Sequence, residues 1–247
     1  MTHTLKHIDF EPPDWAEFAS GPSLQLGYVN QVLSDSPAGY WRLGESAGST
    51  TAIDFSGNAS HGTYVGASTL GQPGALATDS DASVRLPGLL GNYVDTPLTS
   101  VAGEPATFEA WVNIPAALST DSAILGQTIV PGDAGSTIFT VRTSLVLRVY
   151  ISSTSLQDNV PLSLNTWHHV AFTYSGSPDG DYQFYLDGAA TSSGTLANNP
   201  SEGTFVIGVH NKLTFNPFNG FIDEVAIYAS ALSADRVLAH YNAGVGR

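Results

Sequence analysis

Alternating apolar and polar positions run through most of this chain and predict many short β-strands. The clearest run is 106–114, where every second side chain is apolar and Glu109, Trp111 and Asn113 point to the opposite face. Runs of this kind predict strands at 39–43, 62–66, 75–77, 82–86, 92–96, 106–114, 122–128, 136–142, 145–152, 166–175, 182–187, 189–196, 204–210 and 218–228. Asp187-Gly188 between two runs is a hairpin signal. Because no helices alternate with these strands, we expect an all-β fold, a two-sheet antiparallel sandwich of about 12–14 strands.

The last predicted strand carries an acid and leads into a helix. Strict alternation places four of its residues on one face: Phe221, Asp223, Val225 and Ile227. A carboxylate among large apolar side chains is costly unless its charge is compensated. Ser233 is a typical N-cap, Leu238 and Tyr241 form an apolar stripe, and Gly244 ends the predicted helix.

Residues 1–33 are predicted to be separate from a jelly-roll domain at 34–247. Leucine and valine spacing predicts a short helix at 24–33, and the prolines before it disfavour regular structure. Phe10, Trp15 and Phe18 make this arm more aromatic than a disordered tail. We interpret them as anchors that dock on a partner protein; the alternative is an arm that folds back on its own domain.

Charge and composition narrow the classes of partner. The 247 residues carry 22 acids against 8 Lys and Arg, a net charge of −14, which disfavours nucleic acids and anionic membranes. The absence of cysteine excludes disulfides, Cys-ligated zinc and thiol chemistry. No apolar run is long enough for a membrane helix, and the N-terminus lacks the apolar stretch of a secretory signal. We therefore expect a soluble protein that is not exported by an ordinary signal.

Four motifs in order resemble one family. They are SPAGYWRLGE (36–45), DFSGNASHGTY (54–64), NTWHHVAFTY (165–174) and FNGFIDEVAIYASALS (218–233). Together they resemble laminin-G-like domains of the concanavalin-A-like lectin/glucanase type over roughly residues 34–244. The resemblance implies the jelly-roll sandwich and a role in recognising carbohydrate or protein at cell surfaces. Because this fold hosts many functions, the resemblance does not identify the ligand.

The resemblance also implies a structural calcium site. In this family the loop matching 54–64 often shares a Ca²⁺ with the aspartate of the closing strand, and the matching positions are Asp54, Asn58 and Asp223. Oxygen ligands on a glycine-containing loop suit this cation. The alternative is that Asp223 pairs with Arg42 or accepts backbone N–H bonds.

No pattern for catalysis is found. Sugar-cleaving relatives carry acids in the form E-x-D-x-E along one strand, whereas the best strand here holds only Glu109. No G-x-S-x-G elbow is present. His168 and His169 are consecutive on a strand, so they face opposite sides and cannot share a metal; we expect one in the core and one partly exposed. The chain is not expected to be an enzyme.

Aromatic and polar residues off the inward pattern are candidates for a carbohydrate site. Sugars stack on aromatic rings beside a few orienting polar groups. The candidates are Tyr64, Tyr93, Trp111, His210 and Asn211. Trp41 and Trp167 are expected to be buried, because they lie in dense apolar runs.

The sequence thus predicts a non-catalytic recognition module that binds glycans or mediates adhesion. Similar domains that open with a stretch like VLSDSPAGYWRLGE occur on phage virion proteins, which implies a tail or capsid-surface protein joined to the virion by the N-terminal arm. The alternative is a structural decoration or assembly protein without a glycan site. A homo-oligomer is compatible with either.

Overall fold

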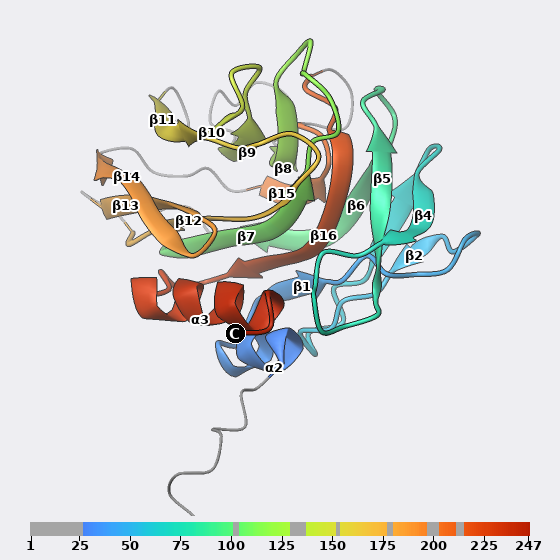
Figure 1. Cartoon of the computed structure of the whole chain (residues 1–247), viewed down its shortest axis with the longest axis horizontal. Helices are drawn as coiled ribbons and strands as arrows, with labels where there is room; N and C mark the ends of the chain where they lie inside the picture. The colour runs from blue at the N-terminus through green and yellow to red at the C-terminus, as the bar shows by residue number, and fades with distance from the viewer. Residues whose placement is uncertain are drawn as a thin grey trace, which may run out of the picture.

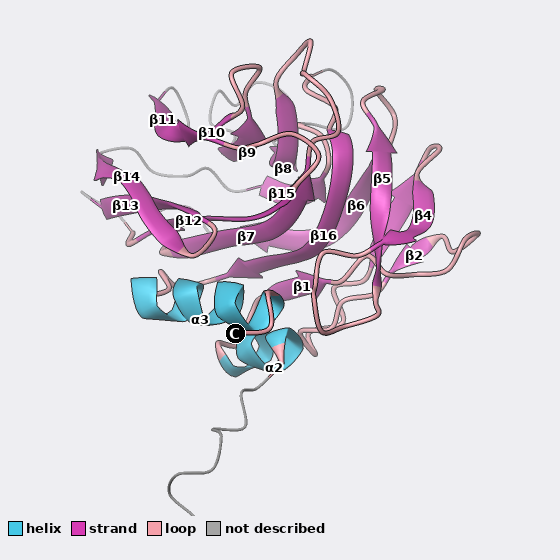
Figure 2. Ribbon diagram, in the orientation of Figure 1, coloured by secondary structure: helices cyan, strands magenta, loops and turns pink. Residues whose placement is uncertain are grey.

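The structure, a computed structural model, describes residues 27–100, 104–128, 137–151, 154–176, 180–196, 203–210 and 215–247. These residues form two antiparallel sheets of eight strands each that pack face to face, with two helices on one outer face (Figures 1 and 2). The predicted jelly-roll sandwich is confirmed.

The first sheet carries the helices. Its strand order is β14 (Ala189–Leu196), β13 (Gly180–Leu186), β12 (Trp167–Tyr174), β7 (Ala106–Asn113), β16 (Asn219–Tyr228), β5 (Ala82–Pro87) and β4 (Thr69–Pro73), and β1 (Gly39–Trp41) also pairs with β16. The chain's last strand, β16, therefore lies in the middle of the sheet.

The second sheet closes the sandwich. Its strand order is β11 (Thr154–Pro161), β10 (Val146–Ile151), β9 (Thr137–Val141), β8 (Ser122–Thr128), β15 (Gly203–Ile207), β6 (Tyr93–Ser100), β3 (Gly62–Val65) and β2 (Thr51–Ala52). Apolar side chains of both inner faces form the main core. Side chains also join the two sheets at one edge, where Asp158 of β11 accepts hydrogen bonds from Thr191 and Ser192 of β14.

The two helices lie together against the outer face of the first sheet (Figure 1). They are α2 (Tyr28–Ser34) and α3 (Ala234–Gly244). The predicted N-cap of α3 is confirmed, because the Ser233 hydroxyl accepts the Arg236 N–H. Leu238, however, is 43% exposed, and Val237 and His240 face the sheet instead. The first residues of the predicted 24–33 helix lie outside the described residues.

Residues 75–77 form a loop and not the predicted strand. Their backbone groups have partners outside a ladder, since Ala75 N–H donates to the Asp223 carboxylate and Ala77 N–H to the carbonyl of Gly244. The strand lies just upstream as β4. The strands β2 and β11 were also not predicted.

A β-bulge interrupts the alternation of β16. Glu224 has φ 51°, and the register with β7 shifts between Asp223 and Ala226. Val225 therefore faces the core between the sheets, while Asp223 lies opposite Trp111 on the helix-bearing face. The prediction that Asp223 shares a face with Val225 and Ile227 is wrong because of this bulge.

Candidate functional site

Asp54 organises the loop between β2 and β3. Its side chain is buried, and Oδ1 accepts the N–H groups of Tyr40 at 3.0 Å and Ser56 at 2.9 Å. Oδ2 accepts the Ser56 hydroxyl and the Ser60 N–H, both at 2.8 Å. Burial alone would raise the pKa of Asp54, but these bonds hold it below its ordinary value. Four donors thus compensate this carboxylate.

Asn58 holds the same loop against the chain before β1. Its amide nitrogen donates to the carbonyls of Pro37 at 3.2 Å and Ala38 at 3.1 Å. Asp54 and Asn58 therefore both shape the predicted loop through hydrogen bonds.

Asp223 lies in a different environment. It is 1% exposed, and Oδ2 accepts the Ala75 N–H at 2.8 Å. Oδ1 is buried and has no hydrogen-bond donor among the described residues. Burial and the neighbouring Glu224 raise the pKa of Asp223 well above its ordinary value. A protonated carboxyl group is the form that this environment favours.

Glu224, rather than Asp223, is the partner of Arg42. Arg42 donates to Glu224 Oε1 from Nε at 3.0 Å and from Nη2 at 2.8 Å. The Tyr40 hydroxyl donates to Oε2. Arg42 also lies 2.7 Å from Asp79 and 3.1 Å from Asp81, so one guanidinium faces three carboxylates. Sequence reasoning missed this cluster, although two consecutive acids in an apolar strand were a signal.

The three predicted calcium ligands do not share hydrogen-bond partners. Asp54 accepts hydrogen bonds from Tyr40 and from its own loop, Asn58 donates to the chain before β1, and Asp223 contacts the loop that follows β4. In the part of the chain that the structure describes, no group of three or more His, Asp or Glu side chains is arranged to hold a metal ion. The orphaned oxygen of Asp223 is the one ligand-like feature of the set. The three residues thus do not fit one coordination sphere, and calcium binding stays a prediction.

Calcium binding can be tested directly by thermal unfolding. If Asp223 is a ligand, adding Ca²⁺ to chelator-treated protein should raise the melting temperature, because a ligand that binds only the native state stabilises it by mass action. The shift should be lost in Asp223→Ala. Superimposable melting curves with Ca²⁺ and with chelator would refute the calcium site.

Two of the predicted sugar-stacking rings are buried. Trp111 is 2% exposed and lies beneath α3, stacked at 6.0 Å on Tyr241. Tyr93 packs against Val206 and Val209. Neither ring offers a face to a ligand here, because the helices and the neighbouring strand cover them.

The remaining candidates are scattered. Tyr64 is half-buried, and its hydroxyl donates to Glu45 at 2.6 Å. His210 is half-buried 6.1 Å from the ring of Phe215. Asn211 lies outside the described residues, as do the predicted partner anchors Phe10, Trp15 and Phe18. Trp41 is buried as predicted, whereas Trp167 is only half-buried.

Glu109 lies at the centre of a buried polar network beneath the helices. It is fully buried and accepts the Tyr28 hydroxyl at 2.6 Å. His240 Nδ1 lies 2.9 Å from Glu109 Oε2, and its Nε2 lies 2.8 Å from Asp35. His169 Nε2 lies 3.3 Å from Glu109 Oε1.

The two carboxylates on His240 fix its charge. A neutral imidazole has one N–H, so both contacts are satisfied only in the protonated ring. Burial alone would lower the pKa of His240, but Glu109 and Asp35 raise it above its ordinary value. Burial would likewise raise the pKa of Glu109, yet the histidines hold it below its ordinary range. Glu109 is fully buried and joins both helices to the sheet through Tyr28 and His240.

His168 joins a turn to a hairpin. Its Nδ1 lies 2.8 Å from Asp187, and its Nε2 lies 2.8 Å from the Ser163 hydroxyl. This is the hydrogen-bond order of a catalytic triad. However, Nε2 also accepts the Ser163 backbone N–H, and neither of the described pockets adjoins Ser163. The chain of bonds ties the turn before β12 to the β13–β14 hairpin. Both His168 and His169 are buried, contrary to the expectation that one is partly exposed.

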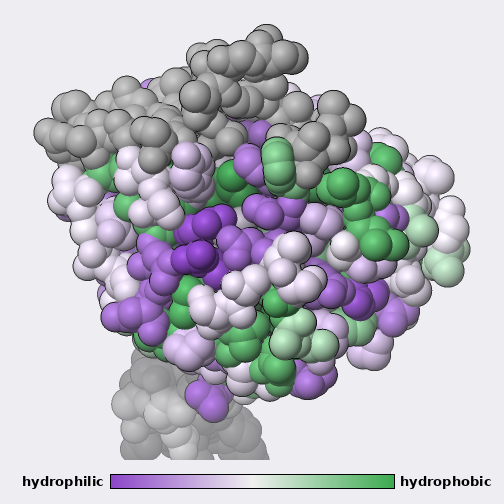
Figure 3. All heavy atoms as spheres, turned by 90° about the horizontal axis from the view of Figure 1, so that it is seen from above, coloured by the Kyte–Doolittle hydropathy of each residue, from purple (hydrophilic) through white to green (hydrophobic). Residues whose placement is uncertain are grey.

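A small apolar cavity opens at one end of the sandwich. It measures about 140 Å³, and Leu98, Phe108, Phe205 and Ile227 line it. A cavity of this size and lining is comparable to one that accommodates a single aromatic ring. Exposed leucines also occur in the turn after β5. On the face seen from above in Figure 3, the hydrophobic patches are small and separated by hydrophilic residues.

A larger polar groove lies on the outer face of β12, β13 and β14. Its volume is about 410 Å³. Its lining is Thr173, Ser175, Asp181, Tyr182, Gln183, Ser193, Gly194, Thr195 and Ala231. Hydroxyl, amide and carboxylate groups dominate this set. A surface of this composition can exchange many hydrogen bonds with a hydroxylated ligand.

Register explains why these polar residues gather. Thr173 pairs with Gln183, and Gln183 pairs with Ser193, so the three form one row across the strands. A second row follows two residues along, where Asp181 pairs with Thr195. Residues two apart on a strand share a face. Sequence reasoning missed this groove, because serine and threonine are common on any solvent-facing strand.

Comparison with known proteins places the chain by fold. A family model described as the concanavalin A-like lectin/glucanases superfamily matches residues 88–238, more than half of the chain. No curated protein sequence matches it.

Several solved structures share the architecture. The binding domain of Paraclostridial Mosquitocidal Protein 1 superposes with TM-score 0.64 at 16% identity, over 85% of this chain and 52% of that one. The Botulinum neurotoxin type G receptor binding domain gives TM-score 0.61 at 13% identity, over 84% and 51%. Trypanosoma rangeli sialidase in complex with sialic acid gives 0.60 at 16%, over 87% and 36%. The chain thus spans about half or less of these proteins, and identities this low establish the fold alone.

Proposed function

Because the chain belongs to the concanavalin A-like lectin/glucanase superfamily, we propose that it is a non-catalytic recognition module that binds carbohydrate. The observation that carries the proposal is the polar groove over β12–β14. It is open to solvent, rich in hydroxyl and amide groups, and of a size typical of ligand sites. The structural neighbours include one domain named as receptor binding and one named as a binding domain, which is consistent with a recognition role.

The absence of catalysis is part of the same proposal. Glycoside hydrolysis uses two carboxyl groups that flank the substrate. Glu109 is enclosed beneath the helices, and Asp181 is the one carboxylate that lines the described groove. A single acid in an open groove can hold a sugar but does not supply an acid–base pair.

Glycan binding is the test of this function. The full chain should bind a subset of an immobilised glycan array with the millimolar-to-micromolar affinities of open polar sites, and it should release no reducing sugar from those glycans. Binding should compete with the free oligosaccharide. No binding to any glycan of the array, or release of reducing sugar, would contradict the proposal.

We place the module on a virion surface as the biological setting of this function. This rests on the resemblance of residues 32–45 to the opening of such domains on phage virion proteins. A structural decoration or assembly role without a glycan site is the alternative. In the described residues, no helix has the length and apolar character needed to span a bilayer.

A further inference from the structure

Among the described residues, one charged side chain, Asp181, and no lysine or arginine line the groove over β12–β14. We propose that it selects neutral sugars and amino sugars and rejects acidic sugars. This inference rests on the proposed carbohydrate-binding function and adds the chemical class of the ligand.

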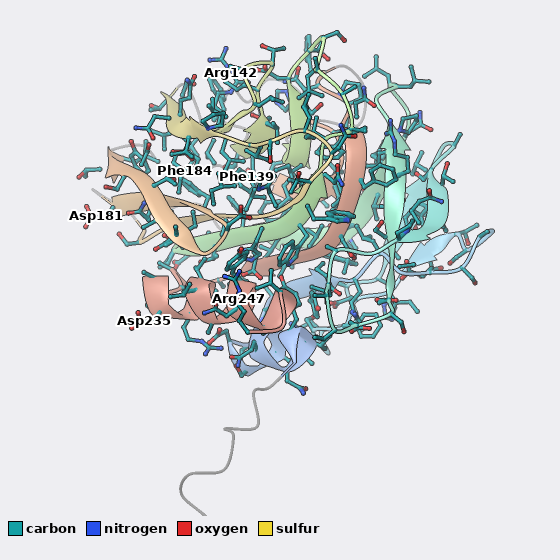
Figure 4. All side chains as sticks on the ribbon, in the orientation of Figure 1. Phe139, Arg142, Asp181, Phe184, Asp235 and Arg247 are labelled. Carbon is teal, nitrogen blue, oxygen red and sulfur yellow. The ribbon has the colours of Figure 1, made fainter. Side chains whose placement is uncertain are left out.

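Asp181 is placed to contact a ligand. It is exposed on β13 and points away from the core, whereas Phe184 on the same strand points between the sheets (Figure 4). Its backbone is fixed, because Ser175 Oγ accepts the Asp181 N–H at 2.8 Å. Among the described residues, its carboxylate accepts one hydrogen bond, from the Thr195 hydroxyl at 3.3 Å. The remaining acceptor sites can take hydrogen bonds from ligand hydroxyl or ammonium groups.

The residues around Asp181 suit sugar hydroxyls. Gln183 is held by its amide nitrogen, which donates to the carbonyls of Phe184 at 2.8 Å and Ser192 at 3.1 Å. Its side-chain oxygen remains an acceptor beside the hydroxyl of the exposed Ser193 in the same row. The row therefore presents both donors and acceptors, as a polyhydroxylated ligand requires.

Acidic sugars lack a counter-charge in this groove. Sulfate and carboxylate groups are usually held by arginine or lysine. Arg42, Arg142, Arg148 and Arg236 are paired with carboxylates elsewhere in the fold. An acidic sugar would meet Asp181 and a chain of net charge −14, so like charges would oppose its binding. An amino sugar would instead pair with the Asp181 carboxylate.

The experiment compares three classes of probe on the full chain. Neutral hexose oligosaccharides, glucosamine oligosaccharides, and the acidic probes 3′-sialyllactose and heparin are titrated at low and at physiological salt. We expect binding of neutral or glucosamine probes and none of acidic probes. Binding of glucosamine probes should weaken with salt, because screening acts on an exposed charge pair.

Two charge variants locate the site. Asp181→Asn keeps the shape and should lower affinity for the binding probes by about tenfold, the effect of losing one charge-assisted hydrogen bond. Asp235 is also an exposed acid, but it lies on α3 outside the groove (Figure 4), so Asp235→Asn should change affinity less than twofold. Circular dichroism and melting curves verify that both variants fold.

Each outcome decides between the two proposals. Binding of acidic probes in preference to the others overturns the charge selectivity and leaves the carbohydrate function standing. Binding of neutral or amino sugars that is unaffected by Asp181→Asn overturns the assignment to this groove. No binding by any probe overturns the carbohydrate function itself.

Discussion

Glu109→Ala is expected to lower the free energy of unfolding by about 3–5 kcal/mol, the range for removing one partner from a buried ion pair. The substitution removes one of the two carboxylate partners of the protonated His240 ring and the acceptor of the Tyr28 hydroxyl. These two residues lie on α3 and α2, so each helix loses a buried polar contact with the sheet. Urea unfolding at pH 6 measures the loss, with exposed Glu104→Ala as the control that should change stability by less than about 0.5 kcal/mol.

The same network predicts a window of pH for its stabilisation. The folded pKa of Glu109 is lowered, so its contribution is present above the unfolded value of about 4.3 and is lost as pH falls. The folded pKa of His240 is raised, so its contribution is complete below the unfolded value of about 6.5 and is lost as pH rises through the folded value. The difference between wild type and Glu109→Ala should therefore be largest between about pH 4.5 and 6.5. A difference that is independent of pH would contradict the charged network.

Asp223→Asn is expected to stabilise the protein increasingly as pH rises, because an asparagine amide cannot ionise in this buried site. The folded pKa of Asp223 is raised, so wild-type stability is greatest below the unfolded value of about 3.9 and falls as pH rises through the folded value. The asparagine amide carries no charge and removes this loss.

The measurement is a pair of unfolding series from pH 5 to pH 9. The two proteins should differ least at pH 5, and the difference should grow as pH rises and Asp223 ionises beside Glu224. Asp235→Asn, on the exposed face of α3, serves as the control. Equal stability of wild type and Asp223→Asn across the series would refute the neutral form of Asp223.

The sequence predicted those parts of the fold that depend on neighbouring residues. Alternation in β7 correctly assigned Phe108 and Val112 to the core and Glu109 and Trp111 to the outer face. The Asp187-Gly188 turn between β13 and β14 was also predicted, because its backbone requires positive φ at both residues. Each of these features is encoded within a few consecutive positions.

Features that join distant segments were not predictable in the same way. The bulge at Glu224 reversed the expected face of the residues after it, and a single chain carries no pattern that marks it. Trp111 was placed on the correct face, but its burial follows from α3, which begins more than a hundred residues later. The groove was missed for a related reason, since its two rows exist only once three strands align in register.

The pairing of α2 with α3 has a mechanical consequence. Arg236 of α3 donates to Asp35 at 2.8 Å and to the Gln31 side chain at 2.9 Å, so the first and last described elements are bonded to each other. A force that pulls residue 27 away from residue 247 would load these few contacts before it reached the strand ladders. The helices would separate first, and the antiparallel pair β1 and β16 would then bear the tension. The two helices would therefore yield at a lower force than the β-sandwich.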